Sequence, residues 1–118
     1  MKKILVIGSL NIDYSIQTDR TPALGETIRA NKYIKSEGGK GANQSYTIGK
    51  LGGDVSMIGA VGNDDNGQIL KNNLASVDVD ISGIETIKDE QTGTAFITVE
   101  KSGNNSIMII EGANRKSW

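Results

Sequence analysis

The sequence predicts an α/β fold in which a small second sheet stands off a sheet of parallel strands. Two short apolar runs, residues 4–7 and 55–61, each end in a glycine, as is typical of buried strands in parallel sheets. A helical pattern follows the second run, which is the strand–helix–strand order of a doubly wound sheet. Residues 93–100 and 106–111 instead alternate polar and apolar side chains with no helix between them, which indicates a separate antiparallel sheet.

The first half of the chain predicts strands, turns and one helix. In order, these are a buried strand at residues 4–7, an alternating strand at 13–18, a turn at 21–25, a weakly alternating strand at 27–34, a glycine loop at 37–41 and a helix at about 42–51. The helix carries Ile48 and Leu51 on its apolar side, and the following Gly52-Gly53 ends it.

The second half predicts one more helix between strands. A strand at residues 55–61 is followed by Asn63-Asp64-Asp65, which can cap a helix at about 66–76. Ile69, Leu70 and Leu74 should face inward from that helix. The remaining elements are strands at residues 80–87, 93–100 and 106–111, with a hairpin turn at 101–105.

These elements form one domain with two parts. Residues 1–10 and 41–87 supply the core, and the strands at about 13–18, 27–34, 93–100 and 106–111 supply the small sheet. Residues 112–118 predict no further helix or strand. Because two helices cannot cover both faces of a parallel sheet, we expect residues 1–118 to be the N-terminal third to half of a larger domain.

Composition excludes several classes of function. The 118 residues carry a formal net charge of −1, which argues against binding to nucleic acid or to an anionic membrane. With neither Cys nor His, the chain can form no disulfide and lacks the usual general base. The apolar run near the N-terminus is too short for a secretion signal, and no segment is long enough to span a membrane. We therefore expect a soluble cytoplasmic protein.

The densest candidate site is the glycine-rich segment at residues 38–45. Gly39 and Gly41 allow the backbone to approach a ligand, Lys40 can supply a cation, and the amide of Asn43 suits a hydroxyl group. The spacing matches neither a P-loop, because Gly41 follows Lys40, nor a dinucleotide fingerprint. A helix N-terminus that uses glycines only for its turn geometry is the alternative interpretation.

Asn11 and Asp13 form a second candidate site directly after the first predicted strand. Open α/β sheets bind ligands at this edge, and residues two apart in an extended segment point the same way. An amide beside a carboxylate can hold adjacent hydroxyl groups. A polar turn without a ligand is the alternative. The carboxylates within residues 62–67 lack the spacing of a calcium loop, so helix capping explains them better.

Taken together, these segments resemble the ribokinase-like, PfkB-type carbohydrate kinases. The resemblance covers essentially the whole chain, and the first signature of that family fits the block from Gly38 to Gly62 specifically. Its markers are residues 8–13, 25–27, 38–45, Gly52, Gly62 with 64–65 and Gly67, 92–93, and 112–114.

The resemblance implies a three-layer αβα body with a β lid over a sugar, the small sheet being that lid. Asn11 and Asp13 would bind sugar hydroxyls, and Ala95 or Ile97 would form an apolar wall. Gly39, Lys40, Gly41 and Asn43 would close on the sugar from the other side. Lids of this family also pair between subunits, so the resemblance implies a homodimer.

One departure from the family bears on activity. The second family signature, Gly-Ala-Gly-Asp, is absent, and with it the aspartate that acts as base and the glycine amides that stabilise the transferred phosphoryl group. The resemblance implies that ATP, Mg²⁺ and a monovalent cation bind in that missing region. We therefore expect the intact protein to phosphorylate ribose or a similar sugar at its primary hydroxyl, and this chain alone to be inactive. A non-catalytic module that binds a sugar or nucleoside, or that dimerises through the lid, is the alternative.

Overall fold

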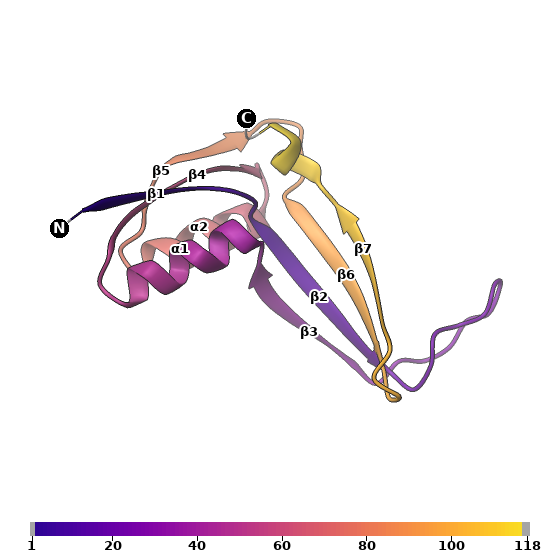
Figure 1. Cartoon of the computed structure of the whole chain (residues 1–118). Coiled ribbons are helices and arrows are strands. Elements are labelled where there is room, and N and C mark those ends of the chain that lie inside the picture. The colour runs from indigo at the N-terminus through magenta and orange to yellow at the C-terminus, as the bar shows by residue number, and fades with distance from the viewer. Residues whose placement is uncertain (1, 117–118) are drawn as a thin grey trace.

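The structure is a computed structural model that describes residues 2–116, and it contains two sheets that meet at one junction (Figure 1). The predicted α/β fold is confirmed. The elements, in chain order, are β1 (Lys3–Ile7), β2 (Asn11–Thr18), β3 (Lys32–Gly38), α1 (Lys40–Lys50), β4 (Asp54–Gly62), α2 (Asp65–Ala75), β5 (Asp80–Ile87), β6 (Gly93–Glu100), β7 (Asn105–Ile110) and the 3₁₀ helix η1 (Gly112–Lys116).

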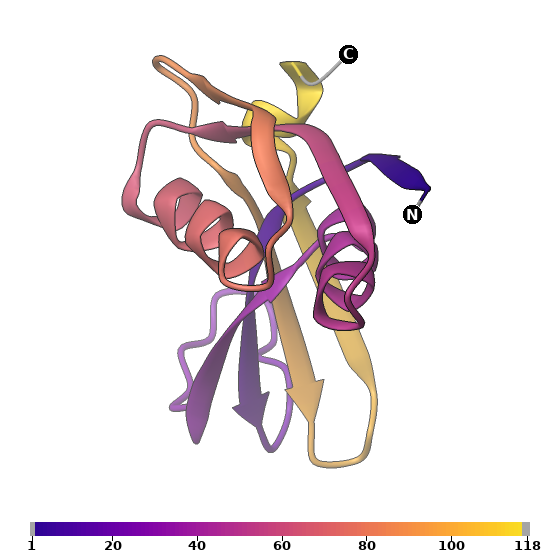
Figure 2. The same cartoon turned by 90° about the vertical axis from the view of Figure 1, so that its left-hand side faces the viewer.

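The core sheet has three parallel strands in the order β1-β4-β5, and both helices lie on the same face of it (Figure 2). Met57 from the central strand packs with Leu70 and Leu74 from α2 in the buried cluster. The sequence determines the start of α2, because Asp64 caps it by accepting a hydrogen bond from the Gly67 amide at 2.9 Å. The body therefore has two layers among residues 2–116.

Strand β1 is more exposed than its apolar sequence predicts. Only Val6 is buried, whereas Leu5 and Ile7 are each 57% exposed. The prediction of a buried first strand is wrong for this chain. Strand β1 lies at the edge of the sheet, and both α-helices cover one face only, so the face with Leu5 and Ile7 is left exposed. A run of apolar residues indicates strand formation but not which faces are covered.

The second sheet, here called the lid sheet, has four strands in the order β3-β2-β6-β7. It extends away from the body as a long, narrow flap (Figure 1). We expected an antiparallel sheet, but β2 and β6 pair in parallel, with Asp13 opposite Ala95 and Ser15 opposite Ile97. Both strands leave the junction with the body and run toward the same end of the flap, which requires the parallel pairing.

Strand β3 begins later than predicted. It spans Lys32–Gly38 rather than residues 27–34, and Gly39 alone separates it from α1, so residues 37–41 are not a loop. Residues 19–31 form a loop instead. Both guanidinium nitrogens of Arg20 donate to the carboxylate of Glu26 at 2.6 Å, and the Ala23 amide donates to the same carboxylate at 2.8 Å. Weak alternation in sequence could not reveal these contacts.

Two predicted inward-facing side chains are solvent-exposed. Leu51 is 83% exposed at the C-cap of α1, and Ile69 is 38% exposed on α2. Leu51 lies after the last helical residue, so the helical face does not extend to it. Ile69 precedes the buried Leu70 by one residue, which places it about 100° around the helix from the packed face.

Candidate functional site

The candidate site lies at the junction between the body and the lid sheet. There the glycine turn before α1 contacts the segment that leads into β2. The Ala42 amide donates to the Ser9 carbonyl at 3.1 Å, and a Cβ on Gly41 would lie 2.7 Å from the Gly8 Cα. Gly39 has a φ of 93°, and a Cβ there would overlap the Ser9 carbonyl. The two segments that sequence analysis singled out therefore pack directly against each other.

Asp13 lies beside the glycine turn and is partly buried. A Cβ on Gly38 would overlap the Asp13 carboxylate, so the missing side chain at Gly38 makes room for it. Burial raises the pKa of Asp13 above its ordinary value. Within residues 2–116, no hydrogen-bond donor reaches this carboxylate. A desolvated acceptor of this kind is suited to a ligand that brings its own hydrogen-bond donors.

Asn11 precedes Asp13 by two residues on the same strand, so both side chains project from the same face of the lid sheet. Asn11 is partly buried, and its Oδ1 accepts a hydrogen bond from the Nδ2 of Asn114 at 2.7 Å. It lines a hollow of about 280 Å³ together with Ser9, Ile109, Glu111 and Asn114. The structure thus places Asn11 beside an open, partly polar space, and Asp13 is not among the residues that line it.

Ala95 and Ile97 share the face of the lid sheet that carries Asp13. Asp13 lies directly opposite Ala95 in the parallel register, and Ile97 follows two residues later on β6. On the other side of β6, Ile109 and Ile107 of β7 continue the same row. A row of apolar residues therefore lies beside Asp13, with Ala95 itself buried, and the predicted apolar wall stays a prediction.

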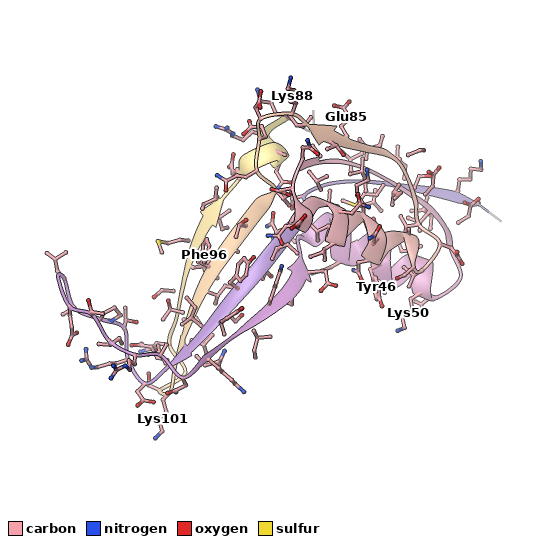
Figure 3. The ribbon with its side chains drawn as sticks, turned by 180° about the vertical axis from the view of Figure 1, so that it is seen from behind. Tyr46, Lys50, Glu85, Lys88, Phe96 and Lys101 are labelled. Carbon is pink, nitrogen blue, oxygen red and sulfur yellow. The ribbon has the colours of Figure 1, made fainter. Side chains whose placement is uncertain are left out.

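The opposite face of the lid sheet has a different character. Tyr14 and Phe96 stack there with ring centroids 5.4 Å apart, and the ring of Tyr33 lies 6.2 Å from that of Tyr14. Figure 3 shows Phe96 projecting from the lid sheet. The two faces are thus chemically distinct, and the polar pair lies only on the face with Ala95 and Ile97.

The predicted residues of α1 are divided between two places. Gly39 and Gly41 contact the Gly8–Leu10 segment, and Lys40 is exposed at the first position of the helix. Asn43 is exposed and lines a different hollow, of about 560 Å³, between β1 and α1. No residue lines both this hollow and the one beside Asn11. Asn43 and Asn11 therefore line different hollows, Asp13 lines neither of these two, and the predicted closure by Asn43 stays a prediction.

Asn114 is a site residue to which sequence analysis assigned no role. Its Oδ1 accepts from the Leu10 amide at 3.0 Å, and its Nδ2 donates to the Leu10 carbonyl at 3.1 Å as well as to Asn11. The only signal in the sequence was the run Gly112-Ala113-Asn114 directly after an apolar strand. That run marks a family resemblance but does not show which segment Asn114 contacts.

Two negative findings concern the described part of the chain. Residues 2–116 contain no group of three acidic side chains close enough together to hold a metal ion. No helix in the same range is long and apolar enough to cross a membrane.

Comparison with known proteins places the chain among carbohydrate kinases. The family model described as "pfkB family carbohydrate kinase" matches residues 1–117. The chain is 41% identical over 113 residues to ribokinase from Haemophilus influenzae, covering 96% of this chain and 37% of that enzyme. It is similar to the structure of Cryptococcus neoformans ribokinase in complex with ADP, with a TM-score of 0.85, 39% identity and coverage of 96% and 35% of the two chains.

The structure of Arabidopsis thaliana ribokinase complexed with ribose and ATP is also similar, with a TM-score of 0.87, 35% identity and coverage of 93% and 36%. The chain thus spans little more than a third of the length of each of these relatives. The match extends over both sheets and both helices, so it includes the junction that carries the candidate site. The chain belongs to the pfkB family of carbohydrate kinases.

Proposed function

We propose that this chain is the N-terminal, sugar-binding part of an ATP-dependent carbohydrate kinase that phosphorylates ribose or a similar sugar at its primary hydroxyl. The single observation that carries the proposal is the partly buried carboxylate of Asp13, which has no donor among residues 2–116 and lies beside Asn11 and the glycine turn. A sugar hydroxyl supplies the missing donor and also accepts a hydrogen bond. The relatives named ribokinase favour a pentose as the ligand.

The site has two chemically different sides, which suits a sugar. Asn11 and Asp13 provide polar groups for hydroxyls, and Ala95 and Ile97 provide an apolar surface for the carbon face of the ring. Gly39, Lys40, Gly41 and Asn43 complete the proposed binding set from α1. Asn43 can take part only if the ligand, or further sequence of the protein, extends from the hollow beside Asn11 to the hollow between β1 and α1.

We propose that the remaining chemistry comes from sequence beyond this chain. We expect ATP, Mg²⁺ and a monovalent cation for the intact enzyme, and residues 2–116 contain no group of three acidic side chains that could hold the Mg²⁺. The catalytic base is likewise expected elsewhere. The proposal therefore includes an inactive chain when it is taken alone and a cytoplasmic location for the whole enzyme.

A homodimer through the lid strands is part of the proposal. Strand β7 is an edge strand, and every residue of it is exposed, with Ile107 at 59%, Met108 at 71% and Ile109 at 63%. An exposed apolar edge strand is a template for association with another copy. The same observation favours the alternative function, a module without catalysis that assembles through its lid.

Titration calorimetry of the complete encoded protein with D-ribose tests the sugar-binding proposal. We expect saturable binding that weakens at least about tenfold in Asp13→Asn, because the neutral amide loses a charged acceptor. Asp54→Asn, an exposed position at the start of β4, is the matched control and should bind normally. Absence of ribose binding in the parent protein, or equal affinity in Asp13→Asn, would remove the proposed site.

A coupled assay of ADP release distinguishes the kinase from the alternative. The complete protein should release ADP from ATP only when ribose is present, whereas residues 1–118 alone should release none. Ribose binding without any ADP release from the complete protein would favour the non-catalytic module. Sedimentation velocity of the same samples reports whether they dimerise, and Ile107→Asp should then shift the species toward monomer.

A further inference from the structure

The side-chain amide of Asn114 has a fixed orientation. An amide has one end that accepts and one that donates, and the two ends look alike in most structures, so the orientation must be argued from the partners. Two of its partners are the backbone N–H and carbonyl of Leu10. Its N–H can only donate and its carbonyl can only accept, so Oδ1 of Asn114 must face the N–H and Nδ2 must face the carbonyl. Leu10 itself is fully buried, which holds these groups in place.

This orientation is passed on to Asn11. The Nδ2 of Asn114 also donates to Asn11 at 2.7 Å, so the end of Asn11 that faces it must be the acceptor, Oδ1. The amide of Asn11 therefore cannot turn over without setting two donors against each other. Its own Nδ2 is left for other partners, and no acceptor within residues 2–116 takes a hydrogen bond from it.

Gly93 leaves the space that this arrangement needs. It lies opposite Asn11 in the parallel register of β2 and β6. A Cβ on Gly93 would overlap both Asn114 Nδ2 and Asn11 Oδ1, the two atoms of the hydrogen bond. The bond between the two amides thus depends on a glycine from a third segment, so three parts of the chain converge on it.

We propose that Asn114 is a positioning residue that fixes Asn11 as a hydrogen-bond donor toward the ligand, beside Asp13 as an acceptor. This inference rests on the proposed function and adds a rule of specificity to it. The site would recognise a pair of neighbouring hydroxyls in defined roles, one accepting from Asn11 and the other donating to Asp13. A ligand group that only accepts would be tolerated at the first position and rejected at the second.

A measurement without ligand tests the orientation itself. Asn11→Asp keeps an acceptor for Asn114, so its midpoint of thermal unfolding should stay within ~3 °C of the parent, whereas Asn11→Leu removes the acceptor and should fall by more than that. The double variant Asn11→Asp/Asn114→Asp sets two carboxylates together and should unfold at a lower temperature than the two single changes predict together. Equal losses in Asn11→Asp and Asn11→Leu would overturn the assigned orientation.

A ligand series tests the consequence for specificity. The complete protein is titrated with D-ribose and with its 2- and 3-deoxy and 2- and 3-deoxyfluoro analogues, because fluorine accepts weakly and cannot donate. At the position that faces Asn11, the fluoro analogue should bind about 3- to 10-fold more tightly than the deoxy analogue, and at the position that faces Asp13 it should have no advantage. In Asn114→Asp, Asn11 can turn and donate to the new carboxylate, so the fluoro advantage should disappear.

Asn104→Asp, in the exposed turn before β7, is the matched control for the change from amide to acid and should keep the parent pattern. A fluoro advantage that survives in Asn114→Asp, or that occurs at neither position of the parent, would overturn the positioning role. If the parent binds no pentose at all, the proposed function fails, and the unfolding measurements then decide the orientation alone.

Discussion

Replacing Thr92 by Val removes one hydroxyl from the hydrogen-bond network that joins the body to the lid sheet. The Thr92 hydroxyl donates to Asp64 at 2.5 Å and accepts from the Gly62 amide at 2.9 Å. The Thr92 amide donates to the other oxygen of the same carboxylate at 2.9 Å. Asp64 caps α2, and Thr92 directly precedes the lid strand β6, so this contact connects the end of the core sheet to the lid.

The cost of Thr92→Val can be worked out from these partners. Val has nearly the same shape as Thr, so the packing changes little and the loss comes from the hydroxyl. Asp64 loses a hydrogen bond to a charged group, worth about 1.5 kcal/mol here because the carboxylate is largely exposed. The Gly62 amide, which is buried, loses its acceptor at a cost of ~1–3 kcal/mol. We expect a total destabilisation of about 3 kcal/mol, which lowers the unfolding midpoint by roughly 10–20 °C.

The pH dependence of unfolding provides a second readout. Burial raises the pKa of Asp64, but the hydrogen bonds from the Thr92 hydroxyl, the Thr92 amide and the Gly67 amide outweigh it and hold the pKa below its ordinary value of 3.8. A lowered carboxyl pKa stabilises the fold above the unfolded value, and this stabilisation is lost as the pH falls through the folded value. Thr92→Val should therefore lose less stability than the parent between pH 5 and pH 2.

Urea unfolding of both proteins at several pH values, followed by circular dichroism, measures both effects. Thr98→Val, on the adjoining strand β6 and without a side-chain hydrogen bond among the described residues, is the matched control and should unfold like the parent. A Thr92 variant that unfolds within about 0.5 kcal/mol of the control would show that the network contributes nothing. If Thr92→Val loses as much stability as the parent between pH 5 and pH 2, the Thr92 hydroxyl does not lower the pKa of Asp64.

Three further predictions concern single side chains. Asp13→Asn should unfold at the same or a higher temperature at pH 7, while its ribose affinity falls. Burial raises the pKa of Asp13 and so disfavours its charged form in the folded state. Thermal scans at pH 4 and 7 should show this gain in stability only at pH 7. Gly93→Ala should lower both ribose affinity and the unfolding midpoint, since its Cβ would displace the Asn11 amide, and an unchanged affinity by calorimetry would argue against that displacement. Arg20→Ala should speed proteolysis within residues 19–31 without changing affinity, because Arg20 holds Glu26 at 2.6 Å and lowers its pKa to about 2. The difference between parent and variant should therefore shrink as the pH falls from about 4.5 toward 2, and equal cleavage rates at pH 7 would refute the clamp.

Local patterns predicted the parts of the fold that local interactions determine. The second helix was predicted because Asp64 is an N-cap residue and Leu70 and Leu74 repeat at helical spacing, and the structure shows both features. The hairpin between β6 and β7 was predicted for the same kind of reason, since Gly103 supplies the positive φ of 99° that the turn requires. In both cases the determining residues lie within a few positions of one another.

Features that depend on distant contacts were not predicted. Parallel pairing of β2 with β6 joins residues more than 80 positions apart, and nothing in either strand's own pattern specifies direction. Asn114 contacts Leu10 across 104 positions. The burial of β1 was overestimated because apolar residues form strands whether or not a second layer covers them.

The residues of the candidate site could be singled out from the sequence because several of them are glycines or lie close to glycines, and their role in binding stays a prediction. Gly38, Gly39, Gly41 and Gly93 each lack a Cβ where a neighbouring backbone or polar side chain occupies the space. Because these contacts lie where β2 and β6 begin, we expect them to influence the orientation of Asp13. Substitutions at Gly38 and Gly93, which lie outside the proposed sugar-binding set, should therefore change sugar affinity without any contact to the sugar. Their effects should be coupled to those of substitutions at Asn114, whose side chain hydrogen-bonds Leu10.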